Sequence, residues 1–75
     1  MIPVDVAGSS CVAHAEYCPE SRVLRIGYVG SGTYDYEGVP PRIVEEFRAA
    51  DSKGHFVNTA IKPHFRYRRR EDGAR

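Results

Sequence analysis

The sequence predicts an α+β fold in which a three-stranded antiparallel meander packs against one main helix. Three short segments of alternating apolar residues lie between residues 10 and 37, and turn signals separate them. A run with helical spacing of apolar residues follows over residues 41–51. Because 75 residues suffice for only one small core, we expect a single domain over residues 1–70 and a disordered tail over residues 71–75.

The first strand is expected over residues 10–17, where Val12 is out of phase with Tyr17. A β-bulge, which adds one residue to a strand, would explain this break in the alternation. A turn at residues 18–21 leads to the second strand, over residues 22–29, which places Leu24, Ile26 and Tyr28 on one face.

The third strand is expected over residues 33–37, after a tight reversal at Gly30-Ser31-Gly32. Glycine suits such a reversal because it accepts positive φ at little cost. This strand places Tyr34 and Tyr36 on one face, which we expect to be the face shared with the apolar side of the second strand.

Helical structure is expected after Pro40-Pro41, because proline fits the first turn of a helix. The main helix should end near Asp51, with Gly54 supplying the left-handed turn that closes it. Ser52 should cap a short second helix over residues 53–61, which Pro63 stops. Residues 65–67 alternate and are a candidate fourth strand at the sheet edge.

The formal net charge of +1 is unevenly distributed. Residues 1–61 carry five basic and eight acidic side chains, a net charge of −3, whereas residues 62–75 carry six basic and two acidic side chains, a net charge of +4. Arginine matches the geometry of phosphate and stacks on bases, so the basic end is a candidate nucleic-acid-binding segment. The candidate residues are Lys53, Lys62, His64, Arg66, Arg68, Arg69 and Arg70. The alternative is a solubilising tail that pairs with the acidic body.

Tyr34 and Tyr36 also have two interpretations. Nucleic-acid-binding modules stack bases on aromatic side chains that project from a sheet. The structural interpretation, which we favour, is that both rings lie in or beside the core, because the helix must cover the most apolar face of the sheet. Their hydroxyls would then find hydrogen-bond partners near the rim.

No catalytic, metal or cofactor site is expected. Cys11, His14 and Cys18 have a ligand-like spacing, but alternation along a strand turns Cys11 away from the other two. An internal disulfide is excluded, because seven extended residues span about 23 Å against a Cα spacing of about 6 Å in a disulfide. No nucleophile has an orienting base, so the chain is not expected to be an enzyme.

Several motifs make the chain resemble the KTSC domain, a small module named for the C-terminal region of some lysyl-tRNA synthetases. The matching positions are Ser9-Ser10, Tyr17, Leu24, Tyr34, Tyr36, Val39-Pro40, Ser52-Lys53-Gly54, Asn58, Ile61 and Tyr67. Glu16 departs from the pattern, where a small residue is expected, and so does the acidic body.

The resemblance implies a non-catalytic, RNA-binding module of about this size. The alternative is a protein-binding module of bacterial or phage origin that inhibits or tethers a host complex. We expect a cytoplasmic monomer or weak homo-oligomer without a membrane segment, because no apolar run approaches the roughly 20 residues that cross a bilayer.

Overall fold

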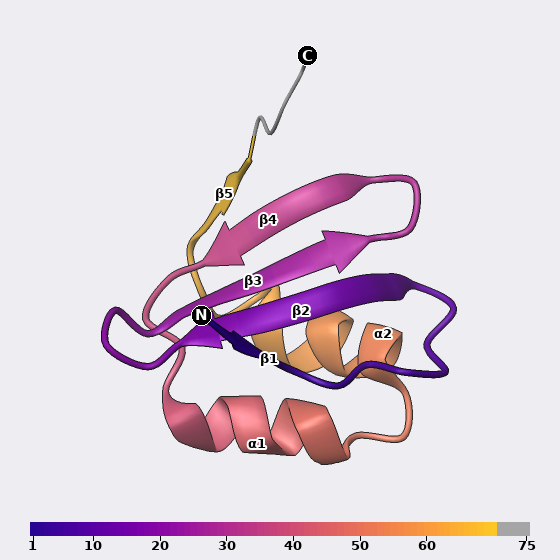
Figure 1. Cartoon of the computed structure of the whole chain (residues 1–75), viewed down its shortest axis with the longest axis horizontal. Helices are drawn as coiled ribbons and strands as arrows, with labels where there is room; N and C mark the ends of the chain where they lie inside the picture. Colours follow the sequence, from indigo (N-terminus) through magenta and orange to yellow (C-terminus); the bar gives the residue numbers. More distant parts are fainter. Residues whose placement is uncertain (71–75) are drawn as a thin grey trace.

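The computed structural model describes residues 1–70, and the disordered tail expected over residues 71–75 lies outside this range. Its centre is a five-stranded antiparallel sheet in the order β1-β2-β3-β4-β5. The helices lie on one side of the sheet, near β1–β3, while β4 and β5 extend beyond them (Figure 1). The predicted α+β class is therefore confirmed.

The predicted meander is formed by β2 (Val12–Cys18), β3 (Val23–Tyr28) and β4 (Gly32–Tyr36). The register of β2 on β3 shifts between Val12 and His14, which is the expected bulge. The extra residue lets Val12 enter the core together with Ala15 and Tyr17, although they are out of phase in the sequence.

Two turns connect these strands with positive-φ residues. Gly30 and Gly32 have φ values of 77° and 87°, so the predicted glycine reversal is confirmed. The turn between β2 and β3 ends at Arg22, whose φ is 57°. The Arg22 carbonyl accepts a hydrogen bond from the Val39 amide, which fixes the approach to the first helix.

Helix α1 (Pro41–Ala49) begins at the predicted proline pair and buries Val44 and Phe47. Its end differs from the prediction, because Ala50 is extended and Gly54 does not have positive φ. Gly54 instead lies inside the second helix, where an added Cβ would sit 3.1 Å from the Cys11 sulfur. A close approach of two segments, rather than a turn, explains this glycine.

The second helical segment consists of α2 (Lys53–Phe56) and the π-helical turn η1 (Val57–Ile61). The Ser52 hydroxyl accepts a hydrogen bond from the His55 amide at 3.2 Å, so the predicted cap is confirmed. Val57 and Ile61 are buried, and the chain turns away at residues 62–64. Among residues 1–70, no helix has the length and apolar character needed to cross a bilayer.

Two edge strands complete the sheet. At one edge, β1 (Ile2–Pro3) pairs with Glu16 and Tyr17, and the residues after it bury Val4 and Val6. The sequence did not predict β1, because two residues that include a proline carry no strand pattern. At the other edge, β5 (Tyr67–Arg69) pairs with β4, two residues later than the predicted segment 65–67.

Candidate functional site

Four tyrosines gather on the face of the sheet that also carries Leu24 and Ile26. They are Tyr28 from β3, Tyr34 and Tyr36 from β4, and Tyr67 from β5. The Tyr34 ring packs edge-on against Tyr28 and Tyr67, with centroid distances of 5.7 and 5.6 Å. Tyr36 and Tyr67 are 5.8 Å apart. These distances are typical of favourable aromatic pairs, so the four rings form one cluster.

The rings of this cluster differ in burial. Tyr36 is only 2% exposed and faces the core together with Leu24, whereas Tyr67 is 60% exposed. Tyr28 and Tyr34 are half-buried between them and pack against the core. The structural interpretation therefore fits the burial of both rings, because Tyr36 is a core residue and Tyr34 lies at the boundary between core and surface.

The hydroxyls of Tyr28 and Tyr36 share a hydrogen bond of 2.7 Å. Burial disfavours the phenolate and raises the pKa of both hydroxyls above their ordinary value. Their mutual hydrogen bond adds to the rise of the Tyr28 pKa and opposes the rise of the Tyr36 pKa. Both groups are therefore neutral at physiological pH and can donate or accept hydrogen bonds.

A groove of about 680 Å³ lies over these rings, and we call it the tyrosine groove. Its lining residues are Ser10, Cys11, Tyr28, Val29, Ser31, Tyr34, Tyr36, Lys62 and Tyr67. Its volume lies within the usual range for small-molecule sites. In the part of the chain that the structure describes, the lining includes hydroxyls, aromatic rings and one cation, and it contains no carboxylate.

Two cations lie over the rings of the cluster. The Lys62 ammonium is 5.1 Å from the centroid of Tyr28, and the Arg69 guanidinium carbon is 5.9 Å from that of Tyr34. Both distances fall within the range of cation–π interactions. Arg69 also lies against Gly32, where an added Cβ would be 3.2 Å from its guanidinium. Lys62 is thus the cation that lines the tyrosine groove, and Arg69 lies over the ring of Tyr34.

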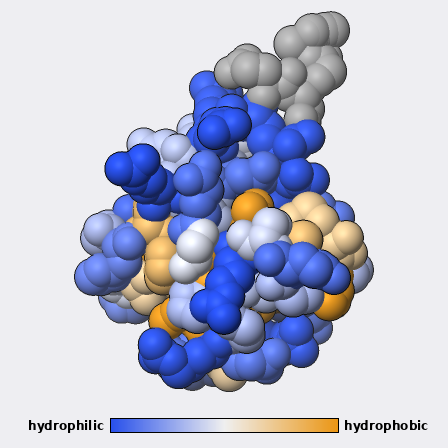
Figure 2. All heavy atoms as spheres, turned by 90° about the vertical axis from the view of Figure 1, so that its left-hand side faces the viewer, coloured by the Kyte–Doolittle hydropathy of each residue, from blue (hydrophilic) through white to orange (hydrophobic). Residues whose placement is uncertain are grey.

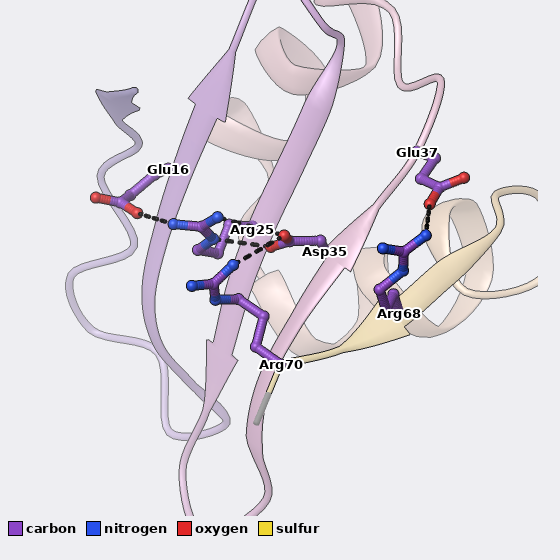
Figure 3. A network of polar contacts seen from close by, with 6 residues as sticks. All are labelled: Glu16, Arg25, Asp35, Glu37, Arg68 and Arg70. Carbon is purple, nitrogen blue, oxygen red and sulfur yellow. Dashed lines mark hydrogen bonds and ion pairs between the residues drawn. The ribbon is translucent and has the colours of Figure 1, made fainter. Parts of the chain in front are cut away.

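Arg68 and Arg70 lie on the opposite face of the sheet, where both reach carboxylates (Figure 3). Arg68 is opposite Asp35 of β4, and the Arg70 amide donates a hydrogen bond to the Thr33 carbonyl. Arg70 reaches the Asp35 carboxylate at 3.4 Å, and Arg68 reaches Glu37 at 3.7 Å. Asp35 also pairs with Arg25 at 2.8 Å, and Arg25 reaches Glu16 at 3.6 Å. A phosphate that binds Arg68 or Arg70 must therefore compete with carboxylates of the same chain.

The remaining candidate cations, which are Lys53, His64 and Arg66, do not form one cluster. The Lys53 ammonium donates hydrogen bonds to the carbonyls of Ala50 and Arg48, at 2.6 and 3.0 Å, and so caps the end of α1. His64 and Arg66 are exposed between η1 and β5. The hydrophilic side chains over β5 gather where the chain leaves the described region (Figure 2).

The sequence reasoning missed the contributions of Tyr28, Tyr67, Ser10 and Cys11 to one groove. Strand alternation offered a partial signal, because Tyr28 was already placed on the apolar face of the sheet. In the described residues, no group of three or more His, Cys, Asp or Glu side chains could hold a metal ion. Cys11 contacts Gly54 on the helix side, whereas the His14 ring lies over Gly27.

The fold and the tyrosine groove define a small α+β domain, in which one antiparallel sheet carries its helices on one side. A family model for the KTSC domain matches residues 8–65, so the chain belongs to the KTSC domain family. Strand β5 lies beyond the matched range.

Known proteins resemble the chain over most of its length. A protein of Tsukamurella paurometabola is 41% identical over 66 residues, covering 88% of this chain and 94% of that protein. A protein of Stutzerimonas stutzeri is 39% identical over 60 residues, covering 79% of this chain and 84% of its own. The crystal structure of a KTSC domain protein from Yersinia pestis has a TM-score of 0.84 at 38% identity, covering 88% of this chain and 93% of that structure.

Proposed function

We propose that this chain is a non-catalytic module that binds RNA through the tyrosine groove and the cations beside it. The observation that carries the proposal is the position of Lys62 and Arg69 over the rings of Tyr28 and Tyr34. Aromatic rings beside cations suit single-stranded nucleic acid, because bases stack on the rings while the cations attract phosphates. The choice of RNA rests on the resemblance to the synthetase appendage.

The charges of the sheet support this choice of face. On the opposite face, the three arginines Arg25, Arg68 and Arg70 are paired with the three carboxylates of Glu16, Asp35 and Glu37. Among residues 1–70, the lining of the tyrosine groove has the cation Lys62 and no carboxylate, and Arg69 lies over its Tyr34 ring. The groove side is therefore the more attractive side for a polyanion.

The test is a titration of labelled single-stranded RNA at several salt concentrations. Lys62→Gln combined with Arg69→Gln removes the two cations over the rings of Tyr28 and Tyr34. The matched control is Arg42→Gln combined with Arg48→Gln, which removes the same charge from exposed positions of α1. Each lost phosphate contact lowers the salt slope by about 0.7 for single strands, so we expect the groove variant to lose about 1.4. The control should retain the wild-type slope.

Equal losses in both variants would show that net charge alone determines binding and would contradict the proposal. Tighter binding of a single-stranded DNA of the same sequence would overturn the choice of RNA. If the wild type does not bind RNA even at low salt, the RNA proposal fails. The protein-binding alternative would then be left to test. Binding to a protein partner through apolar contacts would show little salt dependence.

A further inference from the structure

Tyr67 is the ring of the cluster whose face is most accessible. The rings of Tyr28 and Tyr34 each have a cation over them, and Tyr36 is buried. Tyr67 is 60% exposed and contacts two of the other rings, edge-on to Tyr34 at 69° and tilted by 48° to Tyr36. A flat ligand can therefore stack on Tyr67 without displacing Lys62 or Arg69.

The chemistry of the tyrosine groove selects an occupant that is both planar and anionic. The exposed ring suits an aromatic group, and Lys62 suits an anion. The hydroxyls of Ser10, Ser31 and the Tyr28–Tyr36 pair can each donate or accept a hydrogen bond. Such donors and acceptors match the polar edge of a nucleobase, whereas a purely apolar ligand would leave them unpaired.

We propose that the tyrosine groove binds one unstacked nucleotide, whose base stacks on Tyr67 and whose phosphate contacts Lys62. The edge of the base points toward the hydroxyls of Ser10, Ser31 and the Tyr28–Tyr36 pair. This inference rests on the proposed function and adds to it the unit of recognition, a single nucleotide. Because hydroxyls adapt as donors or acceptors, the groove should bind the four bases with similar affinities.

The test is a chemical-shift titration of the ¹⁵N-labelled chain with a nucleoside 5′-monophosphate, its nucleoside and inorganic phosphate. We expect the monophosphate to shift the amides of Ser10, Ser31, Lys62 and Tyr67. Tyr67→Leu removes the aromatic face at an exposed position and should weaken binding about fivefold or more, the low end for loss of one stacked base. The matched variant Tyr67→Phe keeps the ring and should bind like the wild type.

Equal affinity of Tyr67→Leu and wild type would overturn the inference, as would inorganic phosphate binding as tightly as the monophosphate. Shifts confined to the face of Arg25 and Arg70 would also overturn it. The same variants titrated with RNA separate the two proposals. RNA binding that is unaffected by Tyr67→Leu contradicts the nucleotide site and leaves the proposed function. Monophosphate binding in the groove without RNA binding supports the nucleotide site and contradicts the proposed function.

Discussion

The Tyr28 and Tyr36 hydroxyls are 2.7 Å apart, at the boundary between the core and the tyrosine groove. Tyr36 is buried with Leu24, while Tyr28 lines the groove and lies under the Lys62 ammonium. Each ring therefore joins the core to the surface that we propose binds RNA. Changes at this pair should therefore affect the stability of the fold, and the first two predictions test this effect.

The free energy of unfolding should be insensitive to these two tyrosines below about pH 10 and should fall above it. Burial raises the pKa of both hydroxyls in the folded chain above the ordinary value of 10.0. The unfolded chain therefore releases protons first as the pH rises, which favours unfolding. Urea denaturation at a series of pH values measures this loss. Tyr28→Phe removes one of the two hydroxyls, so the free energy of unfolding of this variant should fall less steeply with pH. The same dependence on pH in both proteins would contradict the raised pKa of Tyr28.

Tyr36→Ala should destabilise the domain by about 3–5 kcal/mol, because it leaves a cavity beside Leu24 in the core. Tyr36→Phe keeps the ring and loses only the hydrogen bond to Tyr28, so it should cost about 1 kcal/mol. Urea denaturation of both variants gives the two values. A Tyr36→Ala protein as stable as the wild type would show that the ring is not part of the core.

The fold was predictable where short-range patterns determine it. The broken alternation at Val12 indicated the bulge, the two glycines indicated the hairpin reversal, and Pro41 indicated the helix start. Gly54 was misinterpreted, because the sequence does not show that Cys11 approaches its backbone. Strand β1 was missed for a similar reason, since pairing with β2 rather than local pattern makes it a strand.

The candidate site was less predictable, because its residues come from distant parts of the chain. Strand alternation placed Tyr34 with Tyr28 on one face, and the basic end supplied Lys62 and Arg69. The register of β5 on β4 decides which arginines reach the groove and which pair with Asp35 and its neighbours. No local pattern fixes that register, so the sequence analysis could not place Arg69 opposite Tyr34.

Asp35→Asn should lower the free energy of unfolding by about 1–2 kcal/mol. The Asp35 side chain is only 19% exposed, and its carboxylate lies between Arg25 and Arg70 at 2.8 and 3.4 Å. Removing its charge leaves two arginines close together without their shared partner. The control Glu46→Gln removes a carboxylate from an exposed pair on α1 and should change stability by less than about 0.5 kcal/mol. Equal effects in urea denaturation would show that the network on the sheet contributes no more than a surface ion pair.

Lys53→Gln should destabilise the domain by about 1 kcal/mol and leave RNA binding unchanged. The Lys53 ammonium donates hydrogen bonds to two carbonyls at the C-terminal end of α1, that of Ala50 at 2.6 Å and that of Arg48 at 3.0 Å. Its hydrogen bonds are therefore made within the chain. It is also absent from the lining of the tyrosine groove. Urea denaturation measures the first effect, and the RNA titration at several salt concentrations measures the second. A salt slope reduced by about 0.7 would instead assign Lys53 a phosphate contact, as the sequence alone suggested, and would extend the RNA-binding surface to α2.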